Sequence, residues 1–254
     1  MIDAAATPGT PQMATVGNAG WRVEFHESAA STNDLASGHP GWSAVVAERQ
    51  THARGRFGRD YQSAPGGLWL SAVVPAPGGA RQWNGFSLAV GLTLAAALGG
   101  LGVPGARLRW PNDLMAGHRK LGGLLIEQNA IETMTVGFGL NVWNRPWESE
   151  RSLETSATRL ADLLDPCPDT ADCLALCLDA IAEAHALLAD MGLAGVIRAL
   201  NPLWWSESVR LDLHDNRTLT GRFLGLDPDG HLRIETAREI VIVPHTTVLR
   251  LTET

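Results

Sequence analysis

Residues 107–142 decide the fold, and they read RLRWPNDLMAGHRKLGGLLIEQNAIETMTVGFGLNV. Three apolar runs, at 107–110, 121–128 and 133–142, predict strands, and Asn129-Ala130 predicts the turn of a hairpin between the last two. A hairpin is an antiparallel connection that needs no helical crossover. The rest of the first 205 residues also mixes strands and helices without a regular βαβ alternation. We therefore predict an α+β fold with a mixed sheet, and not a doubly wound parallel sheet.

Outward from this stretch, the sequence predicts several packed helices. The side chains of residues 31–34 can cap and open a helix, and the Ala- and Leu-rich residues 84–101 predict a buried helix. An amphipathic helix begins at Asp169 and is ended by Gly192. The remaining expected elements are strands at 21–27, 44–48 and 68–74, short helices at 158–164 and 194–200, and a long polar loop at 49–67.

The composition and hydrophobic pattern of the sequence divide the chain into three parts. Residues 1–19 are rich in Ala, Thr, Pro and Gly without periodicity and predict a flexible N-terminal tail, whereas residues 20–206 form the expected main domain. Residues 207–254 change to short alternating strands, which predicts a small β-barrel. Its five expected strands are 209–213, 218–226, 231–235, 240–243 and 248–251.

The composition excludes several classes of protein. The chain has 254 residues, of which 45% are hydrophobic and 19% charged, so it is too apolar for intrinsic disorder. Its net charge of −7 disfavours a nucleic-acid coat or a binder of anionic membranes. No run approaches the roughly 18 apolar residues of a membrane span, and the N-terminus does not resemble a signal peptide. The three cysteines indicate reduced thiols in the cytoplasm, with Cys173 and Cys177 on an apolar helix face.

A loop rich in arginine and glycine is the strongest local feature. Residues 53–59 read ARGRFGR in a chain that is acidic overall. Glycines let backbone N–H groups approach an anion, and arginines donate paired hydrogen bonds to phosphate or carboxylate. The loop therefore predicts an anion-binding segment, with a solvated basic loop as the alternative. An RGG-like nucleic-acid segment is disfavoured because only Phe57 and Tyr61 offer rings for stacking on bases.

A second candidate site spans residues 110–123. A carboxylate at Asp113 suits Mg²⁺ held against substrate phosphates, although a structural turn also explains the WPND sequence at 110–113. Lys120 is the single lysine beside nineteen arginines, and its compact ammonium reaches places that a planar guanidinium does not. Chance survival at an exposed position is the alternative. Gly122 and Gly123 open the next strand, which indicates close approach of a ligand to the backbone, or a β-bulge.

Other common site patterns are missing from the sequence. Residues 137–142, GFGLNV, lack a third glycine and end a strand, which disfavours a Rossmann site, and the P-loop pattern G-x-x-x-x-G-K-[ST] does not occur. The eight histidines never pair at metal-ligand spacing. We therefore expect neither a Rossmann dinucleotide site, nor a P-loop, nor a histidine-based metal centre.

Taken together, the motifs resemble those of the biotin protein ligases, the biotin–[acetyl-CoA-carboxylase] ligases. The resemblance is carried, in order, by STN at 31–33, Gln50 with RGRFGR at 54–59, WPND at 110–113, KLGG at 120–123 and GFGLN at 137–141, and it runs from about Trp21 to Thr254. It implies a class II synthetase-like catalytic domain followed by an SH3-like barrel. It also implies a two-step reaction, in which biotin and ATP give biotinyl-5′-AMP and pyrophosphate, and a lysine of a carrier domain then takes the biotinyl group.

The resemblance implies a role for individual residues. Lys120, Arg56 and Asp113 would carry the chemistry, with Lys120 on the biotin carboxylate and α-phosphate and Asp113 serving Mg²⁺ and the phosphates. The residues implied for biotin binding are Ser31, Thr32, Asn33, Gln50, Arg54, Gly55, Arg56, Lys120, Gly122 and Gly123. Those implied for nucleotide binding are Arg56, Arg59, Asn112 and Asn141. Attack of a carboxylate on a phosphate joins two anions, so it needs cations fixed where the charge develops.

The resemblance also sets expectations for partners and alternatives. Ala53, Tyr61 and Arg109 depart from the usual Gly, Trp and Lys of the family, and Ala53 implies a stiffer loop. The expected ligands and partner are biotin, ATP, Mg²⁺ and the biotin carboxyl carrier domain of a carboxylase. We expect a cytoplasmic monomer or homodimer without a DNA or membrane role, because the tail is too short for the DNA-binding domain of some members. A lipoate- or octanoyl-transferring relative and a non-catalytic biotin-binding module remain as alternatives.

Overall fold

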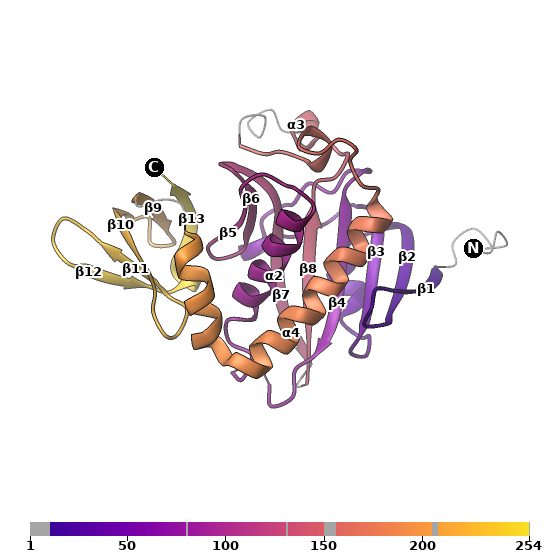
Figure 1. Cartoon of the computed structure of the whole chain (residues 1–254), viewed down its shortest axis with the longest axis horizontal. Coiled ribbons are helices and arrows are strands. Elements are labelled where there is room, and N and C mark those ends of the chain that lie inside the picture. The colour runs from indigo at the N-terminus through magenta and orange to yellow at the C-terminus, as the bar shows by residue number, and fades with distance from the viewer. Residues whose placement is uncertain (1–10, 80, 131, 150–155, 205–207, 254) are drawn as a thin grey trace.

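The computed structural model describes residues 11–79, 81–130, 132–149, 156–204 and 208–253 (Figure 1). Its larger sheet contains eight strands: β1 Gln12–Val16, β2 Trp21–Ala29, β3 Ser43–Gln50, β4 Leu68–Pro75, β5 Ala106–Arg109, β6 Asp113–Ala116, β7 Arg119–Ala130 and β8 Thr133–Leu140. Their spatial order is β1-β2-β3-β4-β8-β7-β6-β5. Four α-helices accompany them in the described parts of the chain: α1 Thr32–Ala36, α2 Phe86–Gly100, α3 Pro146–Ser149 and α4 Thr170–Leu200.

The large sheet combines hairpins with one parallel crossover. β7 and β8 form the hairpin predicted from residues 107–142, in which Leu124 lies opposite Phe138. β2 and β3 are parallel because α1 carries the chain across between them. The other described strand pairs of this sheet are antiparallel. A mixed sheet with packed helices confirms the α+β prediction.

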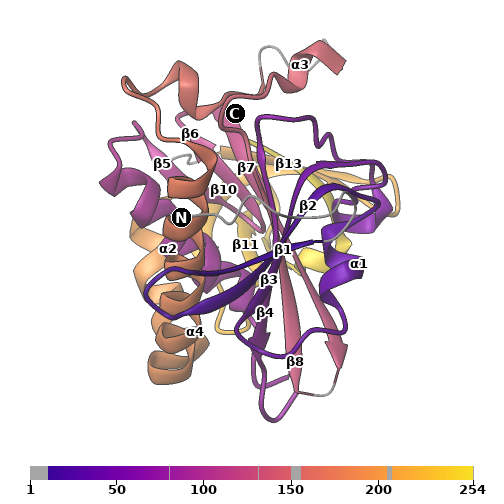
Figure 2. The ribbon, with the colours of Figure 1, turned by 90° about the vertical axis from the view of Figure 1, so that its right-hand side faces the viewer.

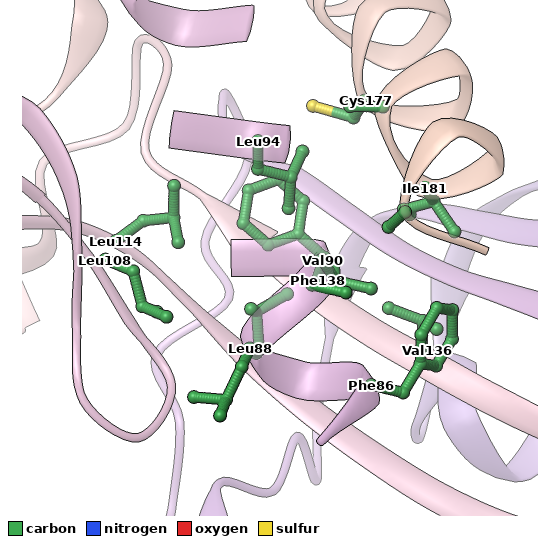
Figure 3. Packing of buried hydrophobic residues seen from close by; sticks show 14 of the residues in the cluster. Phe86, Leu88, Val90, Leu94, Leu108, Leu114, Val136, Phe138, Cys177 and Ile181 are labelled. Carbon is green, nitrogen blue, oxygen red and sulfur yellow. The ribbon is translucent and has the colours of Figure 1, made fainter. Parts of the chain in front are cut away.

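Helices cover both faces of the large sheet (Figure 2). α2 and α4 lie side by side on one face, and α1 lies on the other. The main core fills the space between α2, α4 and the sheet, where Phe86, Leu94 and Phe138 gather with Ile181 of α4 (Figure 3). This double covering leaves the start of α1 beside one end of the central strands, where the cavity described below opens.

A smaller sheet follows the main domain. Its strands are β9 Ser208–Leu213, β10 Thr218–Leu226, β11 Leu232–Glu235, β12 Ile240–Val243 and β13 Val248–Glu253, all antiparallel, in the order β12-β11-β10-β9-β13. It is fastened to the large sheet by a buried ion pair between Arg107 of β5 and Glu253 of β13. The Arg107 Nη1 and Nη2 atoms donate to the two Glu253 carboxylate oxygens at 2.7 and 2.5 Å, and the two side chains are only 4% and 7% exposed.

Helix α4 is a core helix. By length and composition alone the segment Thr170–Leu203 could cross a membrane. Its apolar face, however, packs on the sheet through residues such as Cys177 and Ile181, which explains its composition without a membrane. Cys173 and Cys177 are buried free thiols whose pKa values are raised by burial, as expected for reduced core cysteines. Gly192 interrupts the helix at φ +63°, where the sequence predicted its end.

The structure corrects the sequence-based elements at three places. Residues 12–16 do not belong to a flexible tail but form β1, because they pair with the edge of β2. Residues 113–116 form β6, which was not expected. The helix expected at 158–164 is reduced to a single 3₁₀ turn at Leu160–Asp162. The first ten residues of the predicted tail, and the predicted boundary at 206/207, lie outside the described residues.

Candidate ligand-binding site

A cavity of about 760 Å³ opens between the start of α1, the loop after β3, the strands β7 and β8, and strand β13 of the small sheet. It brings together thirteen of the fourteen residues that the sequence singled out: Ser31, Thr32, Asn33, Gln50, Arg54, Gly55, Arg56, Arg59, Asn112, Asp113, Lys120, Gly123 and Asn141. These residues come from five separate segments of the chain. The fold therefore brings residues that are distant in sequence to the wall of one cavity.

Gly122 is not among the described residues that line the cavity. A Cβ at this position would lie 2.5 Å from the backbone oxygen of Gly139 on the neighbouring strand, so the glycine permits close pairing of β7 with β8. Gly139 does line the cavity, and the ring of Tyr61 lies directly over it. The glycine pair therefore serves two purposes: Gly122 packs the sheet and Gly123 faces the cavity.

One end of the cavity is a network of hydrogen-bond acceptors. The Gln50 side-chain oxygen accepts from the Thr32 backbone N–H at 2.8 Å and lies 3.0 Å from the Thr32 hydroxyl. The Thr32 backbone N–H can only donate, so it fixes the orientation of the Gln50 amide, whose nitrogen then donates to the Ser63 hydroxyl at 3.1 Å. The fully buried Ser71 hydroxyl lies 2.7 Å from the Thr32 hydroxyl and 2.6 Å from the Asn33 side-chain oxygen.

This network has more acceptors than protons. Three oxygen–oxygen contacts link Gln50, Thr32, Ser71 and Asn33, but only the Thr32 and Ser71 hydroxyls carry a proton to place in them. Within the described residues of this network, one contact is therefore short of a donor. A ligand N–H that donates to the Asn33 or Gln50 oxygen frees a hydroxyl proton for the contact that lacks one. A ligand without a donor leaves that contact without a proton, which is costly.

The other end of the cavity is charged. Asp113 lies between two cations: its Oδ1 is 2.5 Å from Lys120 Nζ and its Oδ2 accepts from Arg109 Nη2 at 2.7 Å. Burial on its own raises the pKa of Asp113, but the charges and hydrogen bonds of Lys120 and Arg109 outweigh it and lower the pKa to about 2. The Tyr61 ring closes this cluster, 5.9 Å from Lys120 Nζ. Asp113 is thus an anion that holds two cations in place.

The ionised Asp113 is expected to stabilise the fold in a pH-dependent way. Its folded-state pKa of about 2 lies below the ordinary value of 3.8, so its contribution of about 2 kcal/mol is complete above about pH 4 and disappears as the pH falls towards 2. Urea unfolding of the wild type and of Asp113→Asn at a series of pH values measures this. The stability gap between them should shrink as the pH falls, and a gap that stays constant contradicts the prediction.

The arginine-rich loop at residues 53–59 is attached on one side to α1 and on the other side to the small domain. Arg54 donates to both Asp34 carboxylate oxygens, at 2.9 and 2.5 Å, which ties the loop to α1. Arg56 donates to the backbone oxygen of His245 at 2.5 Å, and Phe57 packs edge-on against His214 at 4.2 Å, which ties the loop to the small sheet. Burial lowers the pKa of Arg56. The loop thus bridges the two sheets over the cavity.

Two residues expected at the nucleotide have their side chains engaged by the protein. The Asn112 amide donates to the Leu124 backbone oxygen at 2.8 Å. The Asn141 amide donates to the Thr158 backbone oxygen at 3.0 Å and accepts from Asn144 at 2.9 Å. Both line the cavity, but their polar groups shape the backbone around it.

Sequence reasoning missed several residues in the cavity wall or behind it. Ser71 is not among the described residues that line the cavity, but its hydroxyl contacts Thr32 and Asn33, which do. The available signal was its position as a single hydroxyl in the apolar strand sequence LWLSAVVP. Strand β13 contributes residues 248–253, including Arg250, to the cavity wall. The strand itself was expected, but nothing in its local sequence marks it as part of a cavity wall, because that role depends on the position of the small sheet.

Comparison with known proteins assigns this mixed sheet with its small C-terminal sheet to a class of ligases. Residues 25–141 match the biotin/lipoate A/B protein ligase family, and residues 207–245 match the biotin protein ligase C-terminal domain. The chain belongs to this family.

Relatives with similarity across most of the chain support this assignment. The biotin–[acetyl-CoA-carboxylase] ligase of Mycobacterium tuberculosis is 33% identical over 217 residues, covering 82% of this chain and 78% of that protein. The ligase of the same name from Paracoccus denitrificans is 31% identical over 212 residues, covering 78% and 86%. The biotin protein ligase from Aquifex aeolicus, solved in complex with biotin and ATP, has a TM-score of 0.77 at 25% identity and covers 91% of this chain and 99% of that chain.

Proposed function

We propose that this protein activates biotin with ATP and transfers it to a lysine of a biotin carboxyl carrier domain. In the first step the biotin carboxylate attacks the α-phosphate, which forms biotinyl-5′-AMP and releases pyrophosphate. In the second step the lysine amine of the carrier attacks the acyl carbon, which forms an amide and releases AMP. The observation that carries the proposal is a single cavity with a donor-deficient acceptor network at one end and fixed cations at the other.

The two ends of the cavity match the two ends of biotin. The ureido ring has two N–H groups, which complete the network at Thr32, Asn33 and Gln50. The valerate carboxylate then points towards Lys120 and Arg56, whose charges offset the repulsion between carboxylate and phosphate. Binding both substrates in one cavity supplies the rest of the acceleration through proximity.

The residues present do not form a ready magnesium site at Asp113. Both of its carboxylate oxygens are taken, one by Lys120 and the other by Arg109. In the described part of the chain no group of three or more His, Cys, Asp or Glu side chains is placed to hold a metal ion. We therefore propose that Asp113 holds the two cations in place and does not ligate a metal ion.

The acceptor network also distinguishes biotin from lipoate. The dithiolane ring of lipoate has no N–H group, so it would leave the network one donor short and bury unmatched oxygens. A non-catalytic biotin-binding module is disfavoured because the charged end of the cavity, with Lys120, Asp113 and Arg56, is intact.

We further propose a carboxylase carrier as the acceptor, a cytoplasmic location, and a catalytic unit at residues 20–206 followed by the small domain at 207–254.

The decisive experiment is mass spectrometry of a biotin carboxyl carrier domain incubated with the protein, biotin and MgATP. The carrier should gain one biotinyl group on one lysine, and omission of ATP should abolish the gain. Lipoate in place of biotin serves as the matched substrate control and should give no modification. An unchanged carrier at high enzyme concentration, while a known ligase modifies it, contradicts the proposal.

Substituting Arg56 should release the activated intermediate. In Arg56→Ala the loop loses its hydrogen bond to His245 and one cation of the cavity, so biotinyl-AMP should escape and acylate lysines without selection. We expect about a tenfold increase in biotin on a bystander protein such as serum albumin, measured by mass spectrometry. Arg49→Ala, at an arginine whose side chain is 53% exposed, is the control. Equal bystander labelling by the two variants would show that Arg56 does not retain the intermediate.

A further inference from the structure

We propose that Glu127 is a positioning residue that sets the ligand selectivity of the cavity through Asn33, an inference that rests on the proposed function. Glu127 is half-buried in β7 and is not among the described residues that line the cavity. Its Oε2 accepts a hydrogen bond from Asn33 Nδ2 at 2.7 Å, across 94 residues of sequence. Asn33 itself is 7% exposed and lines the cavity. A carboxylate outside the cavity therefore holds an amide that faces into it.

The carboxylate determines which way round the Asn33 amide sits. An ionised carboxylate only accepts hydrogen bonds, so the amide nitrogen must face Glu127. The amide oxygen consequently faces Ser71, whose hydroxyl lies 2.6 Å away, and the backbone of Gly137. A Cβ at Gly137 would lie 2.4 Å from this oxygen, so the glycine provides the space that the amide needs. A reversed amide would place its oxygen against the carboxylate.

The orientation of this amide determines the chemistry of the ligand. With its oxygen in the network, Asn33 joins Thr32 and Gln50 as acceptors that are short of one donor. A reversed Asn33 would bring a donor of its own and remove that deficit. Glu127 therefore keeps the cavity selective for a ligand with ring N–H groups, such as the ureido ring of biotin.

Glu127 has a second neighbour that the test must separate from the first. The pKa of Arg54 is raised mainly by its hydrogen bond to Asp34, with a smaller contribution from the charge of Glu127. A change at Glu127 could thus also act on the loop that carries Arg54. Asp34→Asn weakens the attachment of the loop but leaves the partners of the Asn33 amide in place, so it reports the loop effect alone.

The experiment compares Glu127→Gln with the wild type by calorimetric titration of biotin and of the two biotins methylated on one ureido nitrogen. Gln has nearly the same volume but lets the Asn33 amide reverse, so biotin should bind about tenfold more weakly. Glu127→Gln should weaken the binding of at least one methylated biotin less than threefold relative to the wild type, because that ligand already lacks the N–H group that donates to the acceptor network. The biotin KM should rise about tenfold, while kcat at saturating biotin and the KM for ATP should change less than twofold.

Further variants separate positioning from general damage. Gly137→Ala displaces the Asn33 amide while the Glu127 side chain stays in place, and it should reproduce the loss of selectivity. It serves as the test if Glu127→Gln folds poorly. Glu27→Gln, at a carboxylate that is 84% exposed, and Asp34→Asn should both keep the wild-type preference for biotin over its methylated forms.

The outcomes distinguish this inference from the proposed function. If Glu127→Gln binds biotin as tightly as the wild type, or loses all three ligands equally, the positioning role is wrong and the proposed function stands. If the wild-type protein binds no biotin, the proposed function fails, and the inference fails with it.

Discussion

Replacing Lys120 with Arg should lower the rate of biotin adenylation by about 10²–10³-fold, equivalent to about 3–4 kcal/mol, without unfolding the protein. The ammonium lies against Asp113 at 2.5 Å, and a Cβ on Gly123 would lie only 3.3 Å from it. A guanidinium is larger and planar, and it would compete with Arg109 for the same carboxylate. It would therefore keep the charge but displace either a substrate anion or Asp113.

Biotin-dependent exchange of labelled pyrophosphate into ATP measures this first step, and a thermal melt reports the fold. The matched control is the reverse substitution, Arg49→Lys, at an exposed arginine. It should leave the rate of pyrophosphate exchange within twofold of the wild-type rate. Wild-type exchange in Lys120→Arg would show that the chain's single lysine is retained by chance and not because of its shape.

Replacing Glu253 with Gln should destabilise the protein by about 3–5 kcal/mol. The carboxylate is 7% exposed and is the bidentate partner of Arg107, which is 4% exposed, so neutralising it removes the charge that Glu253 places against a buried guanidinium. The same change at Glu235, whose ion pair with Arg222 is 44% and 57% exposed, should cost less than about 1 kcal/mol.

Urea unfolding at neutral pH gives both free energies. A double variant, Arg107→Met with Glu253→Leu, removes both charges and should regain most of the lost stability, because an apolar pair can replace a buried ion pair of similar volume. A loss of less than 1 kcal/mol in Glu253→Gln would mean that water reaches Arg107 and that the two sheets are not fastened at this point.

Short motifs allowed the residues of one cavity to be selected from the sequence, because each carries its own local chemistry. The glycines and arginines of the loop, the WPND turn and Lys120 reach one cavity as expected. Their pairing could not be predicted, since the contact of Asp113 with Lys120 depends on the register between β6 and β7. The role of Glu127 was hidden for the same reason: its partner Asn33 lies 94 residues away.

The missed strands show where local patterns are insufficient. β1 is an exposed edge strand, so its residues lack the alternation of apolar side chains that marks a half-buried strand. β6 has only four residues and begins at Asp113, inside a turn motif. Both strands exist because neighbouring strands offer them hydrogen-bond partners, a tertiary effect that the local sequence does not carry.

The buried pair between Arg107 and Glu253 also has a consequence for synthesis, because it cannot form until residue 253 has been made. Its two residues are 146 positions apart in the sequence. At about 5–20 residues per second, Glu253 is therefore synthesised roughly 7–30 s after Arg107. During that interval the wall formed by β13 does not exist, and the cavity stands open on one side. A chain interrupted anywhere before residue 253 therefore lacks both this ion pair and part of the cavity wall.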